Sequence, residues 1–415
     1  MKYQEVFVPG GFPKYTYNPR AALKLEERLG EVKENLCKLV TVTGNTKSGK
    51  TVLTRRVLPT EEAIWIDGGS VSEESDFWDI VIEQLDLFQV TTVSTENSTT
   101  STVGGALRSA ASLFGVVKGE AETKAELEKE RADGESTQQS LSSRVAAIKG
   151  LKASGIPLVI DDFHYLPKTL QGTIVRVLKP LVFDGQPVVI IAIPHRRYDA
   201  MKVEKEMTGR IYPMQIPVWA VNELTEIPKI GFELLSKPVH DNYLSALAEQ
   251  AIGSPHLMQD FCREVCRQGI DIGDNSNGSA DQILAPVFKE VAETIGRPIF
   301  EKLARGPRQR TDRVVRTLKT GESVDIYQLV LHALAHMKPG LVSIEYEQLR
   351  AAIRDVSAST MPQLHEVARV LKHMSSIAAT DQSSTPVIDF EDDEKKLHIT
   401  DPFFAFYLRW GSLSG

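Results

Sequence analysis

The sequence predicts an α/β fold built on a parallel sheet whose first strand leads into a phosphate-binding loop. The first observation is the segment 44–51, Gly-Asn-Thr-Lys-Ser-Gly-Lys-Thr, which fits the pattern GxxxxGK[ST]. The second is its context, because an apolar and β-branched run, 39–43, precedes it and a helix-compatible segment, 51–57, follows it. The third is a later apolar run, 157–162, that ends in two aspartates. This order of elements is typical of a parallel sheet with crossover helices.

The residue types of the loop suit an anion. Its two glycines let the backbone turn tightly, so that successive N–H groups and the positive end of the next helix face a phosphate. Lys50 would reach the β- and γ-phosphates of ATP, and the Thr51 hydroxyl would ligate Mg²⁺. A plain surface turn is the alternative, but strand, loop and helix together favour phosphate binding. The candidate nucleotide contacts are Gly44, Asn45, Thr46, Lys47, Ser48, Gly49, Lys50, Thr51 and Val52.

The acidic pair Asp161 and Asp162 follows four apolar residues, at the predicted tip of a strand. In this position Asp161 would hold the magnesium ion through water, and Asp162 would orient or deprotonate the attacking water. Two aspartates after a strand are weak evidence alone, and the preceding loop makes them a specific signal.

Composition describes an ordinary globular protein of 415 residues, enough for two or three domains. The net charge of −7 argues against a protein that coats nucleic acid. The three cysteines, Cys37, Cys262 and Cys266, are too few and too badly spaced for a disulfide framework or a zinc site. Because no signal segment opens the chain and no apolar run reaches about 18 residues, we expect a cytoplasmic protein without a membrane span.

The changes of pattern along the chain divide it into four parts. Residues 1–36 form an aromatic, proline-containing lead and a charged helix from about Ala21 to Leu36. Residues 37–220 form the core, with an insertion at 91–143 that is either a flexible excursion or a partner-binding element. A helical lid, 221–275, and a basic helical segment with a C-terminal domain, 281–415, complete the chain.

Several residues outside the two motifs are further candidates. Tyr17 and Arg20 would contact adenine, because the segment before the first core strand wraps the base in many nucleotide-binding ATPases; simple N-terminal packing is the alternative. After the buried strand 186–193, Arg196 or Arg197 would sense the γ-phosphate or form a surface charge pair. Arg210 precedes another strand, a layout that resembles the one in which AAA+ ATPases often place an arginine finger, which would complete a neighbouring subunit's site.

The lid and the C-terminal region carry the remaining signals. Gly253-Ser-Pro-His256 resembles the GxP signature of STAND ATPases, which implies that Pro255 packs near the base; an ordinary helix start is the alternative. The basic run after the helix 283–304 forms a solvated face or contacts phosphates of DNA or nucleotide. Helices at 325–336, 344–356 and 361–374, followed by a hairpin with an acidic turn, predict a winged helix for protein contact or DNA. The basic run consists of Arg305, Arg308, Arg310, Arg313, Arg316 and Lys319.

The order of these motifs resembles the AAA+/STAND branch of P-loop ATPases, including archaeal-type, initiator and transposition-regulator ATPases. The ending 399–410, Ile-Thr-Asp-Pro-Phe-Phe-Ala-Phe-Tyr-Leu-Arg-Trp, is similar to that of many archaeal-type and bacterial STAND members. Many relatives carry glutamate where this chain has Asp162, which fits a slow or conditional ATPase. The resemblance covers nearly the whole chain except the insertion.

The resemblance implies a switch ATPase that responds to ATP, ADP and Mg²⁺, self-associates, and acts in signalling or antiviral defence. Long sensor repeats and a fused effector are absent from the sequence, so we expect a separate effector or sensor protein. A DNA-binding initiator or transposition-regulator ATPase is the alternative, with the basic run and winged helix on DNA. A nucleotide-bound scaffold that barely hydrolyses ATP is a third hypothesis.

Overall fold

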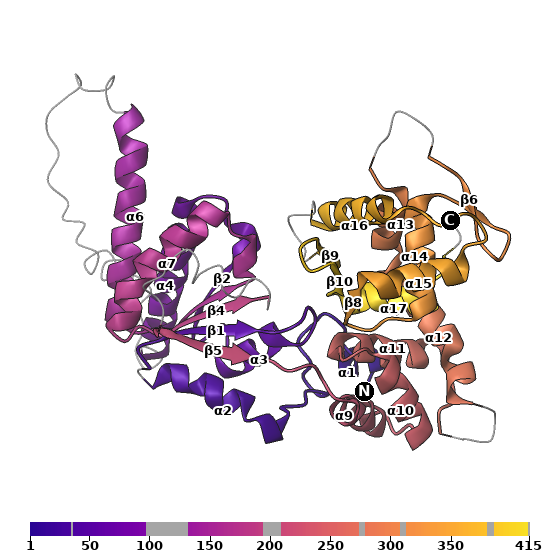
Figure 1. Cartoon of the computed structure of the whole chain (residues 1–415). Helices are drawn as coiled ribbons and strands as arrows, with labels where there is room; N and C mark the ends of the chain where they lie inside the picture. Colours follow the sequence, from indigo (N-terminus) through magenta and orange to yellow (C-terminus); the bar gives the residue numbers. More distant parts are fainter. Residues whose placement is uncertain are drawn as a thin grey trace, which may run out of the picture. The chain divides into compact units, whose positions relative to one another are not determined.

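The computed structural model describes residues 1–34, 36–96, 132–193, 209–273, 279–307, 313–379 and 386–413, with only the backbone for 86–96 and 132–142 (Figure 1). It divides into two compact units. The sheet unit comprises Lys24–Thr43 and Leu53–Gln215, and the lid unit comprises Met1–Leu23, Gly44–Val52 and Ile216–Gly415. No helix in these described ranges is long and apolar enough to cross a membrane.

The sheet unit contains a five-stranded parallel sheet with the order β2-β3-β4-β1-β5, which confirms the predicted α/β class. Leu39 in β1 is level with Val188 in β4 and with Ile211 in β5. All carboxyl ends therefore meet at one edge, where ligands of open α/β sheets bind. The strands are β1 Leu39–Thr43, β2 Ile64–Asp67, β3 Leu158–Asp161, β4 Val188–Ala192 and β5 Ile211–Gln215.

Every residue of β1 and β4 is buried, because helices cover both faces of the sheet. One face packs against α4, α6 and α7 in a single apolar cluster, while α2 and α3 lie on the other side (Figure 1). The helices are α2 Leu25–Gly30, α3 Lys50–Val57, α4 Glu74–Glu96, α6 Ala132–Ser154 and α7 Lys168–Phe183, with short 3₁₀ turns η1 Ala21–Leu23, η2 Glu31–Lys33, η3 Gly68–Ser70 and η4 Phe163–Tyr165.

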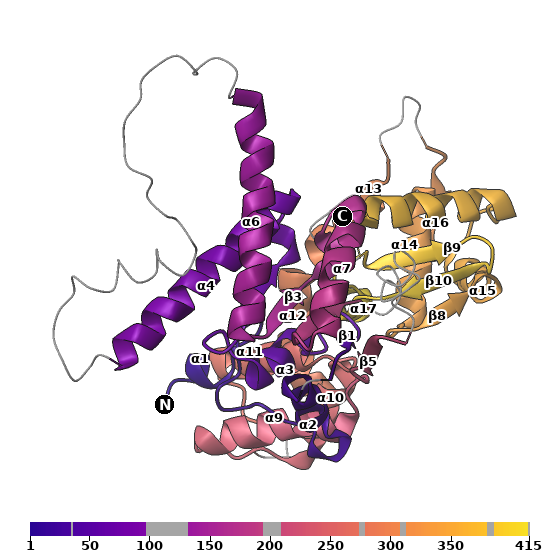
Figure 2. The same ribbon diagram turned by 90° about the vertical axis from the view of Figure 1, so that its left-hand side faces the viewer.

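Two expectations for this region need correction. The continuous helix predicted from Ala21 to Leu36 is interrupted, because Lys24 has a left-handed backbone (φ 51°) between η1 and α2. The insertion predicted at 91–143 is also shorter. Helices α4 and α6, which pack against each other (Figure 2), include residues 91–96 and 132–143. The threonine- and serine-rich composition of this stretch suggested a break, but helix propensity is only a weak guide to where a helix ends.

The lid unit is helical around one continuous apolar core, which joins the predicted lid to the C-terminal domain. Phe261 of the lid, Phe288 and Phe406 meet in this core, with ring centroids 4.9–6.1 Å apart. The helices of this part are α1 Tyr3–Val6, α9 Val221–Leu234, α10 Asp241–Gln250, α11 Pro255–Gln268, α12 Ala280–Ile295 and α13 Arg297–Arg305.

The predicted helix 283–304 is two helices, α12 and α13, that are separated at Gly296. A Cβ atom at Gly296 would lie 2.4 Å from Cβ of Tyr407, so this close approach requires glycine. Pro298 follows within the first turn of α13, where its missing N–H group leaves no helical hydrogen bond unmade.

Three helices and a hairpin do follow, but the predicted helix start at Ile344 is wrong. Ile344 lies in strand β8 of a three-stranded sheet with the order β8-β10-β9, where it pairs with Leu397 and its side chain is buried. The winged helix itself stays a prediction. The elements are β6 Arg316–Thr317, β7 Ser323–Val324, α14 Ile326–Met337, β8 Ser343–Glu345, α15 Tyr346–Val356, α16 Leu364–Ala379, β9 Ile388–Glu391, β10 Lys396–Ile399 and α17 Pro402–Trp410.

Candidate functional site

The loop that follows β1 is built as a concave backbone turn. The N–H group of Ser48 donates to the carbonyl oxygen of Asn45 at 3.3 Å, and Lys47, the third residue of this turn, has a φ of 60°. Gly49 has a φ of 89°, and a Cβ atom at Gly44 would lie 3.0 Å from Cβ of Ile216. Positive φ angles among negative ones turn successive N–H groups to one side, which makes an anion-binding nest.

Lys50 is the first residue of α3, where the positive end of the helix dipole adds to its own charge. Its Nζ atom donates to the carbonyl oxygens of Gly44 and Asn45, both at 2.9 Å. The ammonium group therefore lies over its own loop, at the place from which it can meet an oxygen anion.

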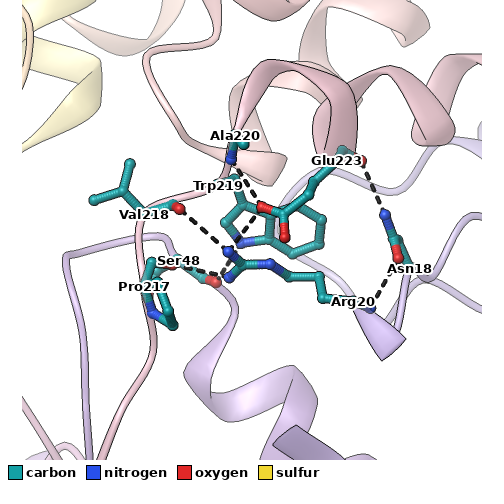
Figure 3. A network of polar contacts seen from close by, with 8 residues as sticks. All are labelled: Asn18, Arg20, Ser48, Pro217, Val218, Trp219, Ala220 and Glu223. Carbon is teal, nitrogen blue, oxygen red and sulfur yellow. Dashed lines mark hydrogen bonds and ion pairs between the residues drawn. The ribbon is translucent and has the colours of Figure 1, made fainter. Parts of the chain in front are cut away.

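Two residues from the lid side contact the backbone of this loop. The indole Nε1 of Trp219 donates to the carbonyl oxygen of Ser48 at 2.9 Å (Figure 3), and Oγ of Ser254 lies 3.5 Å from the carbonyl oxygen of Lys47. Trp219 was not among the residues predicted for this site. A bulky aromatic residue in the short segment between a strand and the lid is the one signal that pointed to it.

Arg20 clamps the segment that contains Trp219. Its buried guanidinium donates to the carbonyl oxygens of Pro217 (2.8 Å) and Val218 (3.1 Å) and to Oε2 of Glu223 (2.8 Å), as Figure 3 shows. It also stacks on the ring of Trp219, with 4.7 Å from Cζ to the ring centroid. These contacts give Arg20 a structural role, and its adenine contact stays a prediction.

Glu223 begins the lid as part of this network. Its carboxylate accepts the N–H of Ala220, and its backbone carbonyl accepts a hydrogen bond from the side chain of Asn18. Burial alone would raise the pKa of Glu223, but the hydrogen bonds from Arg20 and Ala220 and the charge of Arg20 outweigh burial and lower it. The carboxylate is therefore ionised at neutral pH.

The predicted turn at Pro255 begins α11. Ser254 is the N-cap and accepts the N–H of Leu257, with Pro255 in the first turn. The next residue, His256, lies 3.5 Å from Oδ2 of Asp260. Burial and the nearby charge of Lys47 lower the pKa of His256 to about 4, whereas burial raises the pKa of Asp260 to about 7. At neutral pH the imidazole is thus neutral.

Asp161 and Asp162 lie where the sequence placed them, at the carboxyl edge of the sheet. Asp161 ends β3 and pairs in register with Asp67, the last residue of β2. The N–H of Asp162 donates to Oδ1 of Asp161 at 2.9 Å, and Asp162 has a φ of 49°. Gly68 permits a close approach here, because a Cβ atom would lie 2.4 Å from the carbonyl oxygen of Asp162.

Arg210 lies at the opposite edge of the sheet. Its carbonyl oxygen accepts the N–H of Leu39, and its guanidinium lies over the ring of Phe183, 5.2 Å from the centroid. Thr43 pairs with Gln215, which comes five residues after Arg210 in the chain. At a rise of roughly 3.3 Å per residue, Arg210 therefore lies about 17 Å from Thr43 along the strand direction. An arginine finger at this position would have to serve another subunit, and that role stays a prediction. Arg196 and Arg197 lie outside the described residues.

The predicted magnesium ligands are the Thr51 hydroxyl, in the first turn of α3, and the Asp161 carboxylate, at the end of β3, and their sharing of one ion stays a prediction. Hard oxygen donors of this kind, completed by phosphate and water oxygens, suit Mg²⁺. The nest before α3 fits the phosphate that would share the ion. Within the described ranges, no group of three or more His, Cys, Asp or Glu side chains is placed to hold a metal.

The Tyr17 side chain is half-buried in the N-terminal lead, and its contact with adenine stays a prediction.

Comparison with solved structures identifies the fold. A Walker-type ATPase of Pyrococcus abyssi is similar over 93% of this chain and 94% of its own, with 17% identity and a TM-score of 0.50. The ORC2 protein of Aeropyrum pernix, solved as ADPNP and ADP complexes, is similar over 98% of this chain and 95% of its own, with 14% identity and a TM-score of 0.50. No protein-family model matches the sequence, and no curated protein matches it. At these identities the likeness concerns the fold alone, which this chain shares with the Walker-type ATPase and the ORC2 protein.

Proposed function

We propose that this chain binds ATP and ADP with Mg²⁺ and is a slow or conditional ATPase whose nucleotide state controls its lid and C-terminal domain. One observation carries the proposal: the phosphate-binding loop belongs to the same compact unit as the lid and the C-terminal domain. Trp219 and Ser254 contact the backbone of that loop directly. A nucleotide that changes the loop would therefore act on groups fixed to the lid, which a switch requires. The ADPNP and ADP complexes of the similar ORC2 protein support these ligands.

The residues would share the chemistry in the following way. Lys50 would exchange the carbonyl oxygens of Gly44 and Asn45 for phosphate oxygens. Thr51 and Asp161 would hold Mg²⁺, which when bound neutralises charge on the phosphates. Asp162 would position the attacking water and accept its proton. The same proposal includes self-association, an arginine-finger role for Arg210, and a separate effector protein in signalling or defence.

DNA binding is the second candidate function. The helix, strand, two helices and hairpin of α14 to β10 have the order expected of a winged helix, and Arg305 is largely exposed although it lies 3.8 Å from Glu301. Other basic groups are engaged within the chain. Arg313 pairs with Asp325, Arg316 donates to the carbonyl of Thr360, and Lys372 on α16 pairs with Asp392 at 2.8 Å. These internal pairs favour the switch, because DNA would have to compete for the same cations.

Steady-state ATP turnover, with and without duplex DNA, tests both functions. The Lys50→Ala variant is the blank, and Lys168→Ala is the matched control because Lys168 is the exposed first residue of another helix, α7. Loss of charge-assisted hydrogen bonds of about 1.5–3 kcal/mol predicts roughly 10- to 150-fold weaker ADP binding for Lys50→Ala. Slow ATP turnover that is the same with and without duplex DNA supports the switch. Stimulation by DNA that falls steeply with salt supports the alternative, and unchanged ADP affinity in Lys50→Ala refutes both.

A further inference from the structure

The phosphate-binding loop contains one backbone angle that its residue type disfavours. Lys47, at the third position of the turn 45–48, has a φ of 60°. A positive φ at this position is typical of type II turns, which favour glycine or asparagine. A lysine in this conformation needs compensation from its surroundings. The neighbouring Gly49 also has a positive φ but carries no such cost.

The side chain of Lys47 has a partner in the C-terminal helix. Its Nζ atom lies 5.5 Å from the ring centroid of Phe403, the second residue of α17. The same ring meets the ring of His256 edge to face, with centroids 4.9 Å apart and an interplanar angle of 76°. Phe403 thus contacts both a loop lysine and a lid histidine.

The first turn of α17 is itself held rigidly. Asp401 is its N-cap and accepts the N–H of Phe404 at 2.9 Å, and the side chains of Phe404 and Phe406 are fully buried in the core. At the other end of the helix, Nε1 of Trp410 donates to Oε1 of Gln250 at 2.9 Å. Phe403 is therefore presented to Lys47 from a fixed helix.

We propose that Phe403 is a positioning residue for the phosphate-binding loop: its ring holds the Lys47 side chain and so keeps the Lys47 backbone in the left-handed conformation that the nest requires. The contact acts before any phosphate binds, by pre-organising the N–H groups of the loop. This role rests on the proposed function only in naming a nucleotide phosphate as the ligand.

Four proteins test the proposal: the parent, Phe403→Leu, Lys47→Gly and the double variant. Leucine keeps apolar bulk but loses the ring, and glycine adopts the positive φ without help. We expect Phe403→Leu to weaken MgADP binding about threefold in the parent, measured by calorimetry, which corresponds to about 0.7 kcal/mol. In the Lys47→Gly background the same change should leave the affinity unchanged. Equal weakening in both backgrounds would overturn the proposal, because Phe403 would then act through general packing.

A second measurement needs no nucleotide. The Ser48 amide, which donates to Asn45, reports the turn directly by hydrogen exchange in the free protein. Phe403→Leu should speed its exchange about threefold in the parent and not in the Lys47→Gly background; unchanged exchange in the parent would refute the role. The matched control is Tyr15→Leu, which removes a ring at the same 5.5 Å from another lysine, Lys14, and should change neither quantity. If the parent binds no nucleotide, the proposed function fails while this exchange result still decides the role of Phe403.

Discussion

Replacing Arg20 with alanine should loosen the segment that leads into the lid. The side chain of Arg20 is 3% exposed, and that of its ionised partner Glu223 is 21% exposed. The substitution removes three charge-assisted hydrogen bonds and leaves the carboxylate with the Ala220 N–H. Breaking a buried ion pair costs roughly 3–5 kcal/mol, and the partial exposure of Glu223 places this case near about 3 kcal/mol. Local opening of residues 217–224 should become about 150-fold more frequent.

Hydrogen exchange resolved by peptide measures this opening directly, and it does not require the whole chain to unfold in one step. Arg20→Lys should show more than half of the effect, because an ammonium cannot bridge two carbonyls and a carboxylate in one plane or stack as a guanidinium does. The control is Lys229→Ala in α9, which removes a half-exposed pair with Glu226 and should cost at most about 0.5 kcal/mol. Parent-like exchange in Arg20→Ala, or a lysine variant indistinguishable from the parent, would refute the clamp.

Three further predictions concern other residues. The pKa of Asp260 is raised to about 7, so ionisation of Asp260 lowers the free energy of unfolding progressively between about pH 4 and 7. The Asp260→Asn variant should therefore have a higher urea midpoint than the parent at pH 8, and the difference should shrink toward pH 4. Because the pKa of His256 is lowered to about 4, neutral His256 contributes stability that rises from pH 4 to about 6.5. The urea midpoint of Asp260→Asn should therefore rise from pH 4 to about 6.5, and a midpoint that does not change over this pH range would contradict the prediction. Trp219→Phe keeps the ring under the guanidinium but loses the donor to Ser48, and about 1 kcal/mol predicts roughly fivefold weaker ADP binding by titration. If Arg210 acts on another subunit, ATP turnover per subunit should fall on dilution in the parent and lose that dependence in Arg210→Ala; turnover independent of concentration in the parent would exclude the finger role.

Local patterns were sufficient to predict the turn between β1 and α3 and the strands around it. Buried parallel strands are continuous apolar runs, and the loop needs particular residues at fixed spacing, so both leave a signature within a few residues. Asp161 and Asp162 were predicted for the same reason, at the end of such a run. Helix ends were less well predicted, as at Ile344, because pairing with Leu397 in another segment decides whether that residue is strand or helix.

What the sequence by itself determined is the fold class, the position of the loop and the identity of its charged residues. Only the tertiary structure decided which groups hold that loop. Trp219 is 171 residues from Ser48, and Phe403 is farther still from Lys47. Arg20 was predicted only as a base contact, and the structure shows its bonds to carbonyls about 200 residues away. Such contacts depend on how whole helices pack around a shared core, and packing leaves no periodic pattern in the residues that it brings together.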